Sequence, residues 1–99
     1  MEITSREEGN RTVVTLVGRL DTNTSPQLEQ FAADLFENGK NNILVDMEKC
    51  DFVSSAGLRV IVAMQKRVMN SGSLAFCGVQ PDVMDVFEMT GFAKLLTFE

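Results

Sequence analysis

The segment 42–69 passes from a short aliphatic run, through a polar turn, into a helical pattern. Residues 42–47 are rich in aliphatic side chains, which is typical of a strand buried on both faces. From Leu58 onward, apolar side chains recur every three or four positions, which predicts an amphipathic helix. A strand that leads directly into a helix is the repeating unit of α/β proteins, so this segment restricts the chain to that fold class.

The residues before this segment predict a hairpin followed by a helix. Residues 11–17 are β-branched almost throughout and predict an interior strand. The charged residues 2–8 predict an exposed edge strand, which a tight turn at Gly9-Asn10 joins to that interior strand. Residues 28–36 follow the helical period, and Thr24 or Ser25 is expected to cap this helix.

The residues after the segment repeat the order of strand and helix. Residues 73–79 predict a strand, Pro81 opens a third helix, and residues 95–98 predict a short strand or an extended tail. Strand-helix-strand units require parallel strands, whereas the hairpin adds an antiparallel one. The sequence therefore predicts an α/β fold with a small mixed sheet of four to five strands packed with three to four helices. The predicted order is β-β-α-β-α-β-α, with or without a final strand.

Composition predicts one globular domain that spans residues 1–99. The chain is 44% hydrophobic and carries a net charge of -5, without a cluster of Lys and Arg. Nucleic acids and anionic lipids bind grouped cations, so neither is an expected partner. No apolar run is long enough to span a bilayer, and the first residues lack a signal-peptide core. We therefore expect a cytoplasmic protein with no stable membrane association.

The chain contains no histidine, which excludes Ser-His-Asp and Cys-His catalysis. The two cysteines, Cys50 and Cys77, are far apart in the chain and are expected to be small buried side chains rather than metal ligands. Neither Gly-x-x-x-x-Gly-Lys nor Gly-x-Gly-x-x-Gly is present. We therefore expect no metal, no cofactor and no enzymatic activity.

Ser54 and Ser55 lie between the predicted strand and the predicted central helix. A serine at this place can cap the helix, because its hydroxyl oxygen accepts a hydrogen bond from an amide of the first turn. A helix N-terminus also favours negative charge, so a hydroxyl here could carry a phosphoryl group without unfolding the helix. The residue pattern leaves both roles open.

The central helix has apolar side chains on two sides. One side is formed by Leu58, Ile61, Val62, Val68 and Met69, and the other by Ala56, Val60, Ala63 and Met64. Either the helix has a wide buried face, or one side is exposed and docks onto a partner. Arg59 lies between the two sides, where it either pairs with an acidic residue of a partner or is solvated. With a modifiable serine at the same end, we interpret the exposed side as a docking surface.

Three groups of residues resemble a known family. Gly18-Arg19-Leu20-Asp21, the stretch Phe52-Val53-Ser54-Ser55-Ala56-Gly57-Leu58, and Pro81 with Val86-Phe87 and Thr90-Gly91-Phe92 together resemble a STAS domain of the bacterial anti-sigma factor antagonists. The resemblance implies a protein that binds an anti-sigma factor with serine kinase activity and so frees a sigma factor. It also implies that the kinase phosphorylates a serine at the start of the central helix, and that a protein serine phosphatase resets the switch.

The family motif, Asp-Ser-Ser/Thr-Gly-Leu, places the modified serine at Ser55 of this chain. Ser54 stands where the family often has an aspartate, which leaves it as an alternative acceptor, and Asp21 matches a loop aspartate near the modified serine. The resemblance and the pattern together predict a partner-binding set made up of Asp21, Phe52, Ser54, Ser55, Ala56, Gly57, Arg59, Val60 and Met64. The expected oligomeric state is a monomer or a weak dimer.

Two other functions are compatible with parts of the pattern. A STAS domain can also be a regulatory or structural subunit of a membrane transport complex, which is the alternative interpretation of the same resemblance. A small hydrolase with Ser55 as nucleophile would lack a base to activate the hydroxyl, since the chain has no histidine.

Overall fold

The computed structural model describes residues Met1–Glu99 and contains one five-stranded sheet with the strand order β1-β2-β3-β4-β5. Strands β1 and β2 are antiparallel, and the other neighbouring pairs are parallel. The elements in chain order are β1 (Glu2–Glu8), β2 (Arg11–Leu20), α1 (Ser25–Glu37), β3 (Asn42–Val53), α2 (Ser55–Val68), β4 (Ser73–Cys77), α3 (Pro81–Met89), the short 3₁₀ turn η1 (Phe92–Lys94) and β5 (Thr97–Phe98). The predicted mixed α/β fold and its element order are confirmed, and the final strand is present.

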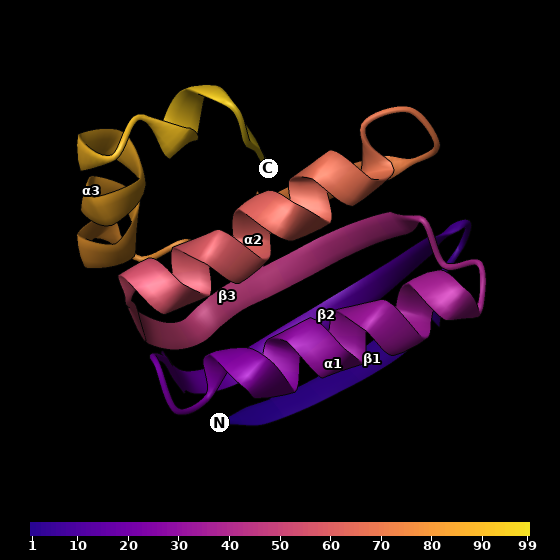
Figure 1. Ribbon diagram of the computed structural model, residues 1–99, viewed down its shortest axis with the longest axis horizontal. Helices are drawn as coiled ribbons and strands as arrows, with labels where there is room; N and C mark the ends of the chain where they lie inside the picture. Colours follow the sequence, from indigo (N-terminus) through magenta and orange to yellow (C-terminus); the bar gives the residue numbers. More distant parts are fainter.

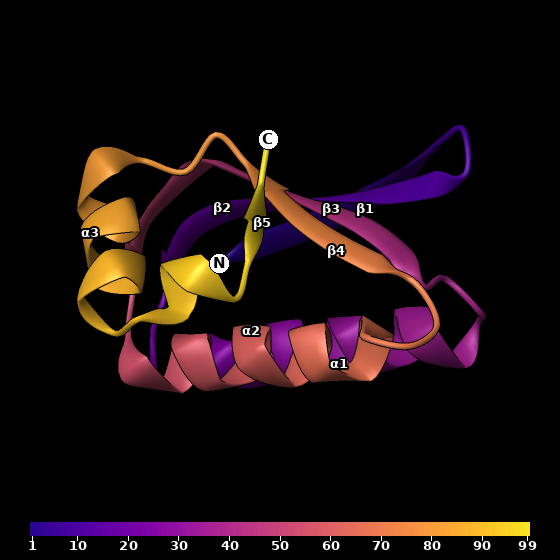
Figure 2. The same ribbon diagram turned by 90° about the horizontal axis from the view of Figure 1, so that it is seen from above.

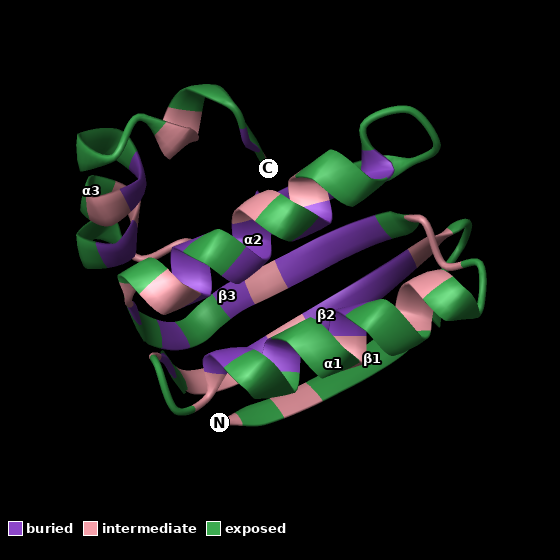
Figure 3. Ribbon diagram, viewed as in Figure 1, coloured by how far each residue is buried: buried purple, intermediate pink, exposed green.

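Helices α1 and α2 lie side by side on one face of the sheet, and α3 lies beyond the end of the sheet where β3 leads into α2 (Figures 1 and 2). The main core fills the space between the sheet and these helices, with Leu16, Ile43 and Phe76 each 0% exposed. No helix covers the opposite face (Figure 2), where a smaller buried cluster consists of Val13, Leu44 and Ala75. The two-layer arrangement leaves the outer sides of α1 and α2 facing solvent (Figure 3).

An aromatic cluster fixes the C-terminal part of the chain. The ring centroids of Phe76, Phe87 and Phe98 lie 5.8–6.2 Å apart in pairs and join β4, α3 and β5. Aromatic rings in this distance range attract one another beyond the area that they bury. The segment between α3 and β5 is therefore held against the main core, on which Phe92 and Ala93 pack.

Strand β3 is longer than the sequence predicts. The predicted strand ends at residue 47, whereas β3 continues to Val53. Strand β4 pairs with β3 only as far as Asp46, but β2 continues to pair with β3 up to Val53, through two register shifts. Because one side of β3 is unpaired there, the exposed Glu48 and Lys49 are tolerated within the strand.

The prediction that α2 has an exposed docking side is wrong for Val60 and Met64. Val60 is 8% exposed and Met64 is 3% exposed, because α2 packs against α1 as well as against the sheet (Figure 3). Met69, which the pattern groups with Leu58 and Ile61 on the other apolar side, is 66% exposed because α2 ends at Val68. None of the helices is both long enough and apolar enough to cross a bilayer.

Candidate functional site

The two serines at the start of α2 have different environments. Ser54 is the N-cap residue, and its hydroxyl accepts a hydrogen bond from Gly57 N at 3.3 Å. Its own amide donates to the carbonyl oxygen of Leu20, at 2.8 Å, so that the cap is attached to the end of β2. Ser55 is the first residue of α2, is exposed, and its hydroxyl has no hydrogen-bond partner within the protein. The hydroxyl of Ser55 is therefore the one that can be modified without breaking a bond of the fold.

Gly57 allows the first turn of α2 to lie against the end of β2. A Cβ atom at this position would come within 2.7 Å of Leu20 Cγ and 3.0 Å of the Leu20 carbonyl oxygen. Gly57 is itself buried, so it positions the helix start and is not part of the exposed surface.

The loop between β2 and α1 is held by Asp21. Its Oδ1 accepts hydrogen bonds from the amides of Asn23, at 2.9 Å, and Thr24, at 3.0 Å. The bond from the Thr24 amide is the largest cause that lowers the pKa of Asp21 below its usual value, and desolvation opposes it. The carboxylate is therefore charged near neutral pH and lies in the loop that follows Leu20, next to the α2 cap.

Thr24 occupies the N-cap position of α1, as predicted, but its side chain makes no capping bond. Its hydroxyl instead donates to the carbonyl oxygen of Arg19, at 2.6 Å, and accepts from the amide of Asp21, at 2.8 Å. The hydroxyl therefore stabilises the Asp21 loop rather than the helix, which is the reason why the predicted cap bond is absent.

Arg19 joins two of the predicted site residues, and the sequence pattern gives it no role. Its guanidinium lies 4.1 Å from the centroid of the Phe52 ring, and its Nε lies 4.0 Å from Asp21 Oδ2. Arg19 and Phe52 are register partners on β2 and β3. Because the register shifts between Gly18 and Arg19, sequence spacing could not have paired these residues.

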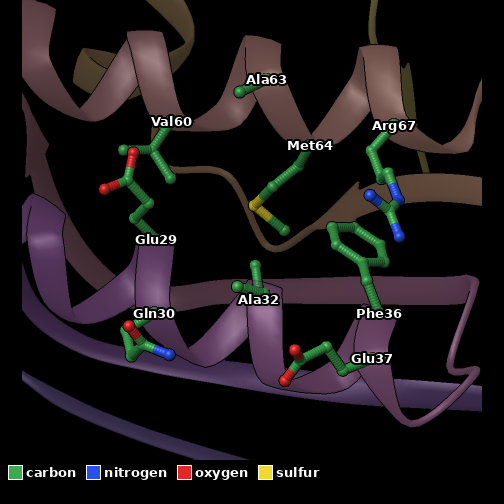
Figure 4. Close-up of a pocket in the computed structure, with 10 residues that line it drawn as sticks. Glu29, Gln30, Ala32, Phe36, Glu37, Val60, Ala63, Met64 and Arg67 are labelled. Carbon is green, nitrogen blue, oxygen red and sulfur yellow. The ribbon is translucent and has the colours of Figure 1, made fainter.

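Several depressions lie along α2, among them the following two. One lies between α1 and α2, has a volume of about 470 Å³, and has Ala32, Val60 and Met64 at its apolar floor (Figure 4). The guanidinium of Arg67 lies 5.3 Å from the centroid of the Phe36 ring at one end of it. The other depression, which we call the α2 groove, has a volume of about 570 Å³ and is lined by Ser55, Leu58, Arg59, Val62, Ala63, Lys66, Thr90 and Phe92.

The structure thus divides the predicted partner-binding residues into two groups. Those at the surface around the start of α2 are Asp21, Phe52, Ser54, Ser55, Ala56 and Arg59, with Ala56, Ser54 and Asp21 half-buried. Those below the surface are Gly57, Val60 and Met64, which are buried. The first group forms a continuous end of the molecule, where the β2–α1 loop, the end of β3 and the first turn of α2 meet. An arrangement of this kind offers a recognition surface in which Ser55 presents a free hydroxyl.

Sequence comparison identifies the family. The sequence profile of the STAS domain matches residues 2–99. BtrV of Bordetella bronchiseptica, named as a candidate anti-sigma factor antagonist, is 30% identical over 96 residues, which cover 96% of this chain and 83% of that protein. The anti-sigma-B factor antagonist of Staphylococcus aureus is 31% identical over 80 residues, which cover 80% of this chain and 74% of that protein.

Solved structures share the fold. A candidate anti-sigma factor antagonist of Thermotoga maritima matches with a TM-score of 0.92 at 17% identity, over 97% of this chain and 84% of that one. SpoIIAA, an anti-sigma factor antagonist and Bacillus cell fate determinant, matches with a TM-score of 0.75 in its unphosphorylated and its phosphorylated form, at 16% and 17% identity. These matches cover 99% of this chain, and 87% and 91% of the two SpoIIAA chains. With the fold and the relatives in agreement, the chain belongs to the STAS domain family of bacterial anti-sigma factor antagonists.

Proposed function

We propose that this protein is a cytoplasmic, non-enzymatic anti-sigma factor antagonist that is switched by phosphorylation of Ser55. In its unphosphorylated form it binds an anti-sigma factor with serine kinase activity and so frees the sigma factor. The kinase then transfers the γ-phosphoryl group of ATP to Ser55 Oγ, the bond to ADP breaks, and the hydroxyl proton leaves. A protein serine phosphatase hydrolyses the phosphoserine and restores the binding form.

The observation that carries this proposal is the difference between the two serine hydroxyls. Ser54 Oγ is engaged as the cap of α2, whereas Ser55 Oγ is exposed and without a partner. The N-terminus of a helix stabilises negative charge, so a phosphate on Ser55 would leave the fold intact. SpoIIAA in its phosphorylated form has the same fold, which also supports this expectation.

The same phosphate would act strongly on a docked partner. It adds about -1.5 to -2 charges and three acceptor oxygens. Burial of such a group without a partner, or against like charge, costs several kcal/mol, and about 1.4 kcal/mol changes an affinity tenfold. We therefore expect the switch to change the surface made up of Asp21, Phe52, Ser54, Ser55, Ala56 and Arg59, and to leave the core unchanged.

Affinity capture from the source bacterium tests the proposal. Wild type, Ser55→Ala and Ser55→Asp are compared, and Ser54→Ala is included to test the alternative acceptor. We expect wild type to retain an anti-sigma factor and to release it with ATP, Ser55→Ala to retain it in ATP, and Ser55→Asp to retain little. Mass spectrometry of the released wild type should find one phosphoserine, at residue 55.

Three results would contradict parts of this proposal. Full phosphorylation of Ser55→Ala would move the acceptor to Ser54. Undiminished binding by Ser55→Asp would remove the switch. Capture of a permease or a transport ATPase, with no anti-sigma factor, would instead favour the alternative role as a subunit of a membrane transport complex.

A further inference from the structure

Helix α2 is basic within an acidic protein. Its sequence contains Arg59, Lys66 and Arg67 and no acidic residue. The whole chain carries a net charge of -5, so the remainder of the molecule has a clear excess of acid. None of the four ion pairs of the structure involves these three cations. Helix α2 therefore carries three cations that form no ion pair; Arg59 and Lys66 line the α2 groove, whereas Arg67 lies over Phe36 of α1.

Two of these cations share the α2 groove with Ser55. Arg59 and Lys66 are exposed, and no acidic residue lines this depression. The rest of its lining is mainly apolar, with Leu58, Val62 and Phe92. A segment that fits such a groove needs carboxylates for the two cations and apolar side chains for the floor between them.

We propose that the α2 groove binds an acidic segment of the anti-sigma factor, and that a phosphate on Ser55 displaces this segment by pairing with Arg59. This inference rests on the proposed function, and it adds the chemistry of the partner segment and the residue through which the phosphate acts. An uncharged or basic segment would leave Arg59 and Lys66 without partners in the complex.

The position of Arg59 on the helix makes the competition possible. Ser55 and Arg59 are four residues apart on α2, and side chains at this spacing are neighbours on a helix surface. An acidic group that precedes a basic one by four residues has the favourable orientation for such a pair. A guanidinium can also bind two phosphate oxygens at once. The phosphate would therefore occupy Arg59 and would cancel most of the positive charge that Arg59 and Lys66 give to the groove.

The pairing within the protein can be measured without any partner. Phosphoserine is installed at residue 55 during translation, and the pKa of its phosphate is measured by ³¹P NMR in wild type, Arg59→Gln and Arg67→Gln. Arg67→Gln is the matched control, since it removes the same charge from the same helix but lies outside the groove. A cation beside the phosphate favours the dianion, so we expect the phosphate pKa to be higher in Arg59→Gln than in wild type by about 0.3 pH units. Arg67→Gln is expected to match wild type. Equal values in all three proteins would overturn the pairing.

The partner segment is tested with the anti-sigma factor that the wild type captures. For unphosphorylated protein, we expect Arg59→Gln and Lys66→Gln each to weaken binding by about two- to fivefold and to reduce its salt dependence. Arg67→Gln is expected to bind as wild type does. Unchanged affinity in both groove variants, or an equal loss in Arg67→Gln, would overturn the inference.

The outcomes separate this inference from the proposed function. If the wild type captures an anti-sigma factor and releases it on phosphorylation, but the groove variants behave as wild type, only the acidic segment and its displacement are wrong. If the wild type captures no anti-sigma factor, the proposed function is wrong and this inference with it. The three variants change exposed side chains, so unaltered circular dichroism and Tm are required before affinities are compared.

Discussion

Replacement of Gly57 by alanine has two opposing effects on stability: higher helix propensity stabilises the fold, and overpacking against Leu20 destabilises it. A Cβ atom at residue 57 would lie 2.7 Å from Leu20 Cγ, 2.9 Å from Leu20 Cδ2 and 3.0 Å from the Leu20 carbonyl oxygen. Leu20 is 0% exposed, and its carbonyl oxygen holds the amide of Ser54. Because the side chain is enclosed and the carbonyl is engaged, neither can move away without loss of other contacts.

The two effects can be compared in free energy. Alanine in place of glycine within a helix stabilises by about 1 kcal/mol. Overpacking a well-filled core costs about 1 to 3 kcal/mol, and contact with both a side chain and a backbone carbonyl places Gly57→Ala near the upper end. We therefore expect Gly57→Ala to lower the free energy of unfolding by about 1 to 2 kcal/mol, with a fall in Tm of roughly 5 to 15 °C.

Urea unfolding followed by circular dichroism measures this change, with thermal unfolding as a second readout. Ala63→Gly is the matched control, because Ala63 is an exposed residue of the same helix and its replacement reports propensity alone. We expect this control to lose about 1 kcal/mol. If Gly57→Ala is more stable than wild type by a similar amount, propensity accounts for both variants and the argument from close contact with Leu20 is wrong.

Three further changes test other contacts. Ser54→Ala should lower the free energy of unfolding by about 0.5 to 1 kcal/mol, since it removes the cap of α2, whereas Ser54→Asp should keep the wild-type value; urea midpoints compare the two. Gly72→Ala should destabilise more than Gly57→Ala, by about 3 kcal/mol, because its Cβ would lie 2.0 Å from the Asn41 carbonyl oxygen. Asp21 has a lowered pKa in the folded state, so the stability that its carboxylate contributes is present above the ordinary Asp pKa and is lost as pH falls through the lower, folded value. Urea midpoints of Asp21→Asn should therefore fall less than those of wild type as the pH is lowered through and below the ordinary Asp pKa, and an equal fall in both proteins would contradict this.

The fold could be predicted largely from local patterns, except where the end of a strand depends on its pairing with neighbouring strands. The alternation of strand and helix patterns depends on residues within one element, and it gave the correct order of elements. The end of β3 depends instead on where its two neighbours stop: β4 ends its pairing at Asp46, while β2 pairs on to Val53. A stretch with Glu48, Lys49 and Asp51 carries no local signal of a strand, so its state could not be predicted from the sequence.

For the site, too, local patterns could not show which side of α2 is covered by another element. Two apolar sides on one helix indicate either a wide buried face or a docking surface, and the choice depends on whether another helix lies beside it. Since α1 covers Val60 and Met64, that part of the prediction failed, whereas Arg59 on the uncovered side is exposed. The role of Arg19 was missed for a related reason, because its contact with Phe52 depends on a register shift.

The use of two adjacent serines explains how a small domain can be switched without being unfolded. If the modified hydroxyl were also the N-cap, a phosphate on it would remove a bond worth about 1 kcal/mol from the start of α2 and would disturb the contact of the first turn with β2. In this chain the cap and the contact with Leu20 belong to Ser54 and Gly57, and the free hydroxyl belongs to Ser55. Phosphorylation of Ser55 is therefore expected to destabilise the complex with a partner that docks beside Ser55, and not the fold. This is the condition for a switch that acts on a complex. A measurement of Tm for the protein with phosphoserine at residue 55 tests this separation: we expect a change within a few degrees of wild type, and a fall as large as that of Gly57→Ala would show that the two roles are not separate.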